Sequence, residues 1–283
     1  MAYSRIEVKP LAGAIGAEIV GVDLGAALAN EVIDEVHRAF LDHQMIYFRH
    51  QRFSPAQQVA VARNFGKPAI YPFLKGLDGQ PEVHEIIKTE TDKKNFGGGW
   101  HSDTAYKERP DMGTLLYALD VPAAGGDTLF SSMYAAYEAL SPGMKRLVEG
   151  LWAINNSDKG YKGGRAAQVS QLGGMGAAVV ASAPVLEAEH PVVRTHPETG
   201  RKGLYVSRAH TLRFRDMTEE ESAPLINFLA DHAVRPEFTC RLRWEKGTFA
   251  IWDNRCTQHC ALNDYQGHRR HMHRVTLEGE RPA

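Results

Sequence analysis

Short apolar runs, each broken after a few residues by glycine, proline or polar residues, constrain the fold of this chain more than any other feature. Such runs, when rich in β-branched and aromatic residues, are typical of β-strands. They predict strands at 6–11, 17–24, 45–50, 114–119, 127–132, 203–207, 239–254 and 270–279. Helical spacing of apolar residues predicts helices at 29–44, 54–66, 141–151 and 218–233. Strands and helices do not alternate regularly, so we predict a β-rich α+β fold, a sandwich or barrel decorated by helices.

The segment 155–184 differs from the rest of the chain because it is rich in glycine, alanine and serine. A long stretch of weak pattern inside a compact domain usually forms a functional lid or a mobile loop. Apolar strands resume directly after it, which disfavours two domains joined by a linker. We therefore predict a single domain over 1–283 with a mobile lid at about 155–184.

Charge and composition exclude several classes of partner. The 283 residues include 33 Lys and Arg against 34 Asp and Glu, so no basic surface for nucleic acid or anionic membranes is predicted. No apolar run approaches the roughly 20 residues of a membrane-spanning helix, and the N-terminus lacks a signal-peptide pattern. Three cysteines do not make a disulfide framework and favour a reducing compartment. We expect a cytoplasmic protein that acts on a small molecule.

The stretch GGGWHSDTAY, residues 97–106, contains His101 and Asp103 one residue apart. Alone, this spacing fits two ordinary polar residues as well as it fits part of a metal site. His259 lies far downstream, but it becomes a candidate third ligand if end strands pair with middle strands. Two histidines and one carboxylate form the facial triad of non-haem Fe(II) oxygenases. Such a triad leaves three positions open, enough for a bidentate 2-oxo acid and dioxygen.

Two arginines on the last predicted strand suggest two bound anions. Arg270 can take the far carboxylate of a 2-oxo acid with its planar fork, and Thr128 can add a hydroxyl to the same carboxylate. Arg274 lies an even number of positions from Arg270, so both would point into the interior. Arg274 would then meet an anionic primary substrate, with a structural ion pair as the alternative. His271 and His273 would face outward as solvated or interface residues.

Five motifs in order resemble the taurine dioxygenase (TauD/TfdA) family of Fe(II)- and 2-oxoglutarate-dependent dioxygenases. They are WHSD (100–103), GGDTLF (125–130), THPETGRKGLYVS (195–207), WDNRCTQH (252–259) and HRRHMHR (268–274), and the likeness covers nearly the whole chain. The resemblance implies a double-stranded β-helix (jelly-roll, cupin-like) core with peripheral helices. It implies Fe(II) bound by His101, Asp103 and His259, and 2-oxoglutarate held by Thr128 and Arg270.

The same resemblance implies that Arg274 meets a sulfonate or carboxylate of the substrate. The enzyme would use O2 to hydroxylate that substrate and would release succinate and CO2 from 2-oxoglutarate. A homodimer or a homotetramer is expected.

The chain departs from the family pattern where the substrate is chosen. Taurine-specific members carry a histidine after the second helix and an asparagine shortly before the WH pair, whereas Tyr71 and Gly97 stand here. Together with Phe73 and Tyr205, Tyr71 predicts a roomier and more aromatic pocket. We therefore expect a small anionic organic substrate of the sulfonate, sulfate ester or aryloxyalkanoate type rather than taurine.

Two other classes of protein stay open. A non-catalytic jelly-roll binding protein could retain the metal site, although a binding module has no need of an open one. Cys256, His259 and Cys260 could instead form a structural zinc site, but this set lacks a CxxC pair and a fourth ligand group.

Overall fold

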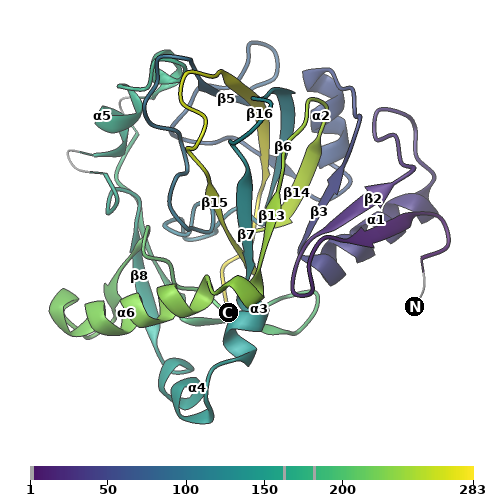
Figure 1. The fold of residues 1–283 in the computed structure, drawn as a ribbon. Helices are drawn as coiled ribbons and strands as arrows, with labels where there is room; N and C mark the ends of the chain where they lie inside the picture. Colours follow the sequence, from purple (N-terminus) through teal and green to yellow (C-terminus); the bar gives the residue numbers. More distant parts are fainter. Residues whose placement is uncertain (1–2, 162–163, 181–182) are drawn as a thin grey trace.

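The computed structural model describes residues 3–161, 164–180 and 183–283 (Figure 1). Its largest sheet has eight strands, and strands from both ends of the chain lie side by side in it. The main path is β1-β2-β3-β14-β6-β16-β4, and β5 also pairs with β16. The bounds are β1 Glu7–Pro10, β2 Ala17–Val20, β3 Met45–Phe48, β4 Pro68–Ala69, β5 His84–Lys88, β6 Gly113–Asp120, β14 Phe249–Asp253 and β16 Arg270–Leu277.

A three-stranded sheet with the order β13-β7-β15 is the second element that positions the site. It contains β13 (Thr239–Leu242), β7 (Thr128–Ser132) and β15 (Thr257–Ala261). Phe130 of β7 packs on Trp252 of β14 in the large sheet, with 5.4 Å between ring centroids. Both rings are buried in one apolar cluster, so the two sheets share a core.

Helices cover the other face of the large sheet. α1 (Asn30–His43) and α2 (Pro55–Ala62) bury Phe40 and Val59 in an apolar cluster with Val275 of β16. The start of α2 is fixed by a capping box in which Ser54 and Gln57 exchange side-chain and backbone hydrogen bonds. This cluster is separate from the one between the sheets, so β16 has an inner and an outer face.

The remaining elements cluster beside the sheets. They are α3 (Met133–Glu138), α4 (Pro142–Val148), α6 (Glu219–Ala233), the two-stranded sheet β10 (Val193–Thr195) with β11 (Lys202–Leu204), and the three-stranded sheet β12 (Thr211–Phe214), β8 (Trp152–Asn156), β9 (Glu187–Pro191). A short 3-10 helix, η2 (Pro236–Phe238), follows α6. In the described part of the chain, no helix combines the length and apolarity needed to cross a bilayer.

The prediction of a strand-rich α+β fold is confirmed, and each of the four predicted helices is present with slightly shorter bounds. The segment 155–184 contains more structure than its composition predicts. It holds α5 (Arg165–Val169) and a short 3-10 helix, η1 (Gly176–Ala178). Residues 162–163 and 181–182 of the expected lid lie outside the described residues.

Candidate active site

His101, Asp103 and His259, far apart in the sequence, meet at one point of the structure. His101 and His259 exchange both backbone hydrogen bonds, at 2.8 and 3.1 Å, so an isolated β-bridge brings the loop before β6 onto β15. Oδ1 of Asp103 lies 3.5 Å from Nε2 of His101 and 3.9 Å from Nε2 of His259. The three ligand atoms lie within 4.8 Å of one another, which is close enough to share one metal ion.

Hydrogen bonds orient two of these side chains. Nδ1 of His101 lies 2.6 Å from the Gly99 carbonyl oxygen, which is the acceptor for an Nδ1 proton. Nε2 is then unprotonated and directed toward Asp103. The second carboxylate oxygen of Asp103 accepts a 2.7 Å hydrogen bond from the Thr114 hydroxyl. Oδ1 is therefore the oxygen left to face the two histidines.

A buried polar chain fixes Thr114 in turn. Its hydroxyl accepts a 3.0 Å hydrogen bond from Nδ2 of Asn254, and Oδ1 of Asn254 accepts another from the Trp252 indole. These residues lie on β6 and at the end of β14, adjacent strands of the large sheet. Partners of this kind typically orient ligands and change metal affinity. Sequence analysis missed them because nothing local marks their pairing.

The protonation states of Asp103 and His259 suit a cation. Burial would raise the pKa of Asp103, but His259, His101 and the charge of Arg274 lower it well below its usual range. Burial first, and then His101, lowers the pKa of His259 to about 3. An ionised carboxylate and neutral imidazoles are the forms that ligate a divalent metal.

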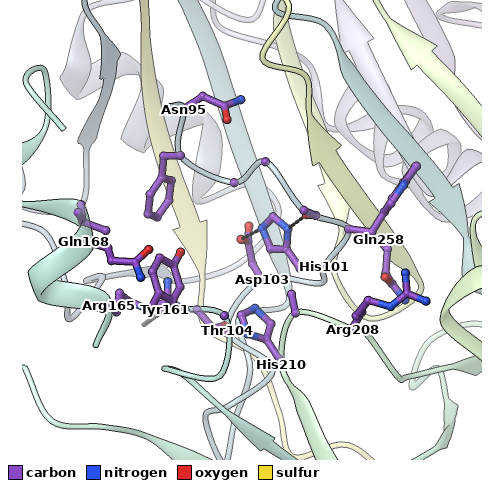
Figure 2. A pocket seen from close by; sticks show the side chains of 18 of the residues that line it. Asn95, His101, Asp103, Thr104, Tyr161, Arg165, Gln168, Arg208, His210 and Gln258 are labelled. Atoms are coloured by element: carbon purple, nitrogen blue, oxygen red, sulfur yellow. Dashed lines mark hydrogen bonds and ion pairs between the residues drawn. The ribbon is translucent and has the colours of Figure 1, made fainter. Parts of the chain in front are cut away.

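A cavity of about 530 Å³ opens in front of His101 and Asp103 (Figure 2). Tyr161, Arg165 and Gln168 lie on one side of it, and Arg208 and Gln258 lie on the other. Aromatic and further polar groups complete the wall: Tyr71, Lys94, Phe96, Trp100, Tyr106 and His210. Residues of the predicted lid segment therefore form part of the cavity wall.

Arg165 connects that segment to the aromatic side of the cavity, a role that the sequence did not indicate. The guanidinium is buried and donates to the Ser157 carbonyl and to the Tyr71 hydroxyl, at 2.8 and 3.3 Å. It also stacks over three aromatic rings, with centroid distances of 5.0, 4.9 and 4.5 Å to Phe73, Tyr106 and Tyr161. These contacts attach the segment that contains α5 to the aromatic side of the cavity.

Arg270 and Arg274 lie on the inner face of β16, as the even spacing predicts. Arg274 lies with its Nη1 3.9 Å from Oδ1 of Asp103 and its guanidinium 4.4 Å from the Tyr71 ring centroid. Arg270 stacks at 5.7 Å over Trp244, whose indole donates a 2.9 Å hydrogen bond to the Thr128 hydroxyl. Nε and Nη2 of both buried arginines have no hydrogen-bond partner within the described chain. Both guanidinium groups can therefore donate hydrogen bonds to a bound anion.

Lys88 is a third inward cation, and the sequence reading overlooked it. It lies directly opposite Arg270 in the register of β5 and β16. Its ammonium group is buried 4.4 Å from the Tyr265 ring centroid and has no hydrogen-bond partner among the described residues. Burial lowers the pKa of Arg270, so an anion between the two cations would stabilise their charged forms.

The predicted aromatic residues do not all line the cavity. Tyr71 lines it, whereas Phe73 lies behind it, 5.5 Å from Tyr71 and 5.8 Å from Tyr106 between ring centroids. Tyr205 is absent from the lining residues and packs against Arg194 at 5.1 Å. Gly97 lines the cavity, and its φ is +80°. Glycine adopts this conformation most readily, and asparagine adopts it more readily than most other residues.

The structure does not bring the cysteines to His259 as a zinc site. Cys256 lies instead near His196 and Asp253, and both oxygens of Asp253 accept hydrogen bonds from Arg255. Cys260 points its thiol at the Gly98 carbonyl. His271 and His273 face outward, as predicted. His273 is only 9% exposed, however, so it is not a solvated residue.

The chain is similar to a family of known proteins over most of its length. The family model described as "Taurine catabolism dioxygenase TauD, TfdA family" matches residues 7–276. An alkylsulfatase of Acinetobacter baylyi is 34% identical over 278 residues, which is 98% of this chain and 86% of that protein. An alpha-ketoglutarate-dependent sulfate ester dioxygenase of Pseudomonas putida is 34% identical over 280 residues, 99% of this chain and 91% of that protein.

Solved structures match the whole fold. A taurine dioxygenase from Burkholderia xenovorans superimposes with a TM-score of 0.83 at 35% identity, covering 99% of this chain and 93% of that one. A protein called AAD-2, in complex with Mn(II) and N-oxalylglycine, matches with a TM-score of 0.79 at 26% identity, covering 99% of both chains.

Proposed function

Because this chain belongs to the TauD/TfdA family and is an alpha-ketoglutarate-dependent dioxygenase, we propose that it hydroxylates a small anionic organic substrate at an Fe(II) centre. Alpha-ketoglutarate is the 2-oxoglutarate of the sequence prediction. The observation that carries the proposal is the juxtaposition of a buried two-histidine, one-carboxylate cluster with two inward arginines whose Nε and Nη2 atoms lack hydrogen-bond partners in the described chain. A binding protein without turnover has no use for both features.

In this proposal, His101, Asp103 and His259 hold one Fe(II), and the residues fit that ion. Their three ligand atoms converge, the carboxylate is ionised, and Thr114 occupies the carboxylate oxygen that faces away. When bound, Fe(II) would activate O2 and couple the loss of CO2 from alpha-ketoglutarate to hydroxylation of the substrate. The AAD-2 complex with Mn(II) and N-oxalylglycine supports this, since N-oxalylglycine differs from alpha-ketoglutarate by an N–H in place of one methylene.

Arg270 binds the far carboxylate of alpha-ketoglutarate, with Thr128 and Lys88 as supporting contacts. The Arg270 fork suits a carboxylate bidentately, and its Nε and Nη2 atoms are free within the described residues. Thr128 is joined to Arg270 through Trp244, and Lys88 faces Arg270 across the strand pair. Anchoring at this end leaves the 2-oxo acid end to approach the metal cluster.

Arg274 binds the anionic group of the primary substrate, and Tyr71 packs against the substrate body. Arg274 lies beside Asp103, so an anion there is held next to the metal cluster. The relatives called alkylsulfatase and sulfate ester dioxygenase favour a sulfate ester, with sulfonates and aryloxyalkanoates as further candidates. Hydroxylation of the carbon that bears the ester oxygen would weaken its C–O bond, and the product would separate into an aldehyde and sulfate.

Two further features belong to the same proposal. We take the shared core between the two main sheets as the double-stranded β-helix of a single domain. The segment 155–184 acts as a lid, because Arg165 and Tyr161 reach the cavity from it. Amide exchange in its described residues should slow by several-fold when metal, alpha-ketoglutarate and substrate are all bound, and equal protection without ligands would contradict the lid.

The test of the function is substrate-stimulated succinate formation across alkyl sulfates, sulfonates, aryloxyalkanoates and taurine. A sulfate ester with an apolar body should be the best substrate. Arg274→Ala should raise the KM for that substrate at least tenfold while changing the KM for alpha-ketoglutarate much less. Arg270→Lys, the matched variant on the same strand face, should do the reverse because the fork is lost. If taurine or a neutral compound is best, the substrate assignment is wrong.

A further inference from the structure

The outer face of β16 carries a second cluster with the same ligand types as the candidate active site. His271 and His273 are two positions apart and point away from Arg270 and Arg274. β5 and β16 lie side by side (Figure 1). Glu85 lies directly opposite His273 in their register. Candidate ligand atoms of the three side chains all lie within 4.8 Å of one another.

We propose that Glu85, His271 and His273 form a second metal site, for a divalent late transition metal such as Zn²⁺. Imidazole nitrogen with one carboxylate oxygen is a donor set that zinc accepts, and three protein ligands leave a fourth position for water. The site is independent of the proposed dioxygenase function, because it lies on the face of the sheet opposite the cavity.

The strand geometry preorganises the three ligands. Two histidines at positions i and i+2 of a strand project from the same face, and their rings lie 5.5 Å apart between centroids. Nε2 of His271 already lies 2.8 Å from Oε1 of Glu85, so a cation would replace a shared proton rather than require new backbone positions. The backbone of His273 is held by a 3.1 Å hydrogen bond from the Gln58 side chain to its carbonyl oxygen.

The cluster is also open to ions from solution. The side chains of Glu85 and His271 are 39% and 20% exposed, whereas His273 is nearly buried beneath them. No arginine or lysine forms an ion pair with Glu85 among the described residues, so its carboxylate is available. The cluster at Asp253 differs in this respect, because Arg255 takes both of its oxygens.

A metal bound here would join β5 to β16. The inner faces of the same strands carry Lys88, Arg270 and Arg274, so the ion would brace the strands that hold the proposed anion sites. A metal that binds the folded chain but not the unfolded chain raises the free energy of unfolding. The increase grows with the logarithm of the ratio of metal concentration to Kd. The site would therefore act as a stabilising clamp.

Zinc counting by equilibrium dialysis tests the proposal. The full-length chain, freed of metal, should bind two Zn²⁺ per chain, one in each cluster. His271→Ala and Glu85→Gln should each bind one, and so should His259→Ala, which removes the candidate active site instead. His43→Ala, a partly exposed histidine outside all three clusters, should still bind two. Two separate variants at the outer cluster guard against loss of folding in either one.

Thermal unfolding supplies the second readout. In the His259→Ala chain, Zn²⁺ at about 100 times its Kd should raise the Tm by roughly 5 °C, and adding His271→Ala should abolish this rise. The proposal is overturned if His271→Ala and Glu85→Gln both bind as many Zn²⁺ as the parent chain, or if zinc leaves the Tm of His259→Ala unchanged.

Discussion

In the described part of the chain, two clusters contain two histidines and one carboxylate, and β16 separates them. The inner cluster of His101, Asp103 and His259 is buried beside a cavity, whereas the outer cluster of Glu85, His271 and His273 borders solvent. Ligand type alone therefore does not distinguish a catalytic centre from a binding site. The difference lies in what surrounds each cluster.

The inner cluster has partners that prepare it for a reaction. Thr114 orients Asp103, and Gly99 fixes the tautomer of His101. Arg274 adds a cation at 3.9 Å from Asp103 that has buried nitrogen atoms without partners in the described chain. The outer cluster has a paired Glu85 and His271 but none of these additions, so we expect it to bind a metal and to catalyse nothing.

A third cluster, His196, Asp253 and Cys256, shows how ligand types become purely structural. Arg255 and His196 together occupy the Asp253 carboxylate. Burial would raise the pKa of Asp253, but these hydrogen bonds lower it to about 2. The Arg255 backbone N–H adds a further hydrogen bond to Oδ1, so the four acceptor positions of this carboxylate are filled and none is left for a metal.

The largest expected effect separates the inner from the outer cluster. His259→Ala should lower succinate formation at least 10³-fold, because the facial set loses one of three ligands. The outer cluster stays intact in this variant, so metal retained there should not restore turnover. Succinate assays with metal analysis on the same sample check this, and His43→Ala is the control. If turnover persisted in His259→Ala, the inner cluster would not be the catalytic centre, and the account of the two clusters would be wrong.

Stability should respond most strongly at the third cluster. Asp253→Asn leaves the buried Arg255 with only the partly exposed Glu198 as an ionised partner, and loss of the buried pair costs about 3 kcal/mol of the free energy of unfolding. Urea unfolding measures this, with Glu85→Gln as the matched change in a partly exposed pair and an expected loss below about 1 kcal/mol. Equal losses would mean that the Asp253 pairing is no more structural than the outer one.

The polar chain behind Asp103 should affect metal affinity without being a ligand. Thr114→Val removes the hydroxyl that orients the carboxylate, so Fe(II) affinity should fall by about 10-fold to 100-fold. Thr276 lies opposite Thr114 on β16, and its buried hydroxyl has no partner among the described residues. Thr276→Val is therefore a matched control with little expected change. Similar affinities in the two variants would argue against the positioning role of Thr114.

The smallest effect concerns pH and the inner face of β5. Burial first, and then the charge of Arg274, lowers the pKa of His84 to about 4, below its unfolded value near 6.5. The unfolded chain therefore binds more protons between these values, and stability falls as the pH falls. Between pH 7 and pH 6 the loss from His84 should be about 0.7 kcal/mol. Urea unfolding of the parent chain and of His84→Asn at pH 7 and pH 6 tests this. The loss of stability between the two pH values should be smaller in the variant by the contribution of His84.

The sequence indicated the inner cluster more completely than its surroundings. His101, Asp103, His259 and the two arginines lie in recognisable motifs, and the alternation of a strand was enough to place Arg270 and Arg274 on one face. Thr114, Asn254 and Trp252 could not be linked in advance, because their contacts depend on the order of strands in the sheet. Lys88 was missed because β5 was not predicted, and without β5 Glu85 had no known neighbour.

The lid shows a second limit of sequence analysis. Composition identified the segment 155–184 as unusual, but it did not predict α5 or the burial of Arg165 between aromatic rings. Two of the three rings around Arg165 belong to Phe73 and Tyr106, which lie far away in sequence. Tyr205 was expected at the cavity for its aromatic character alone, and it instead packs beside Arg194.

The most direct test of this account is a crystal structure of the chain with Mn(II) and N-oxalylglycine. The account predicts that an anomalous difference peak will place the Mn(II) ion within bonding distance of Nε2 of His101, Oδ1 of Asp103 and Nε2 of His259. It also predicts that the far carboxylate of N-oxalylglycine lies on the Arg270 fork. A well-occupied ligand whose far carboxylate binds Arg274 instead, or manganese absent from the inner cluster, would contradict it.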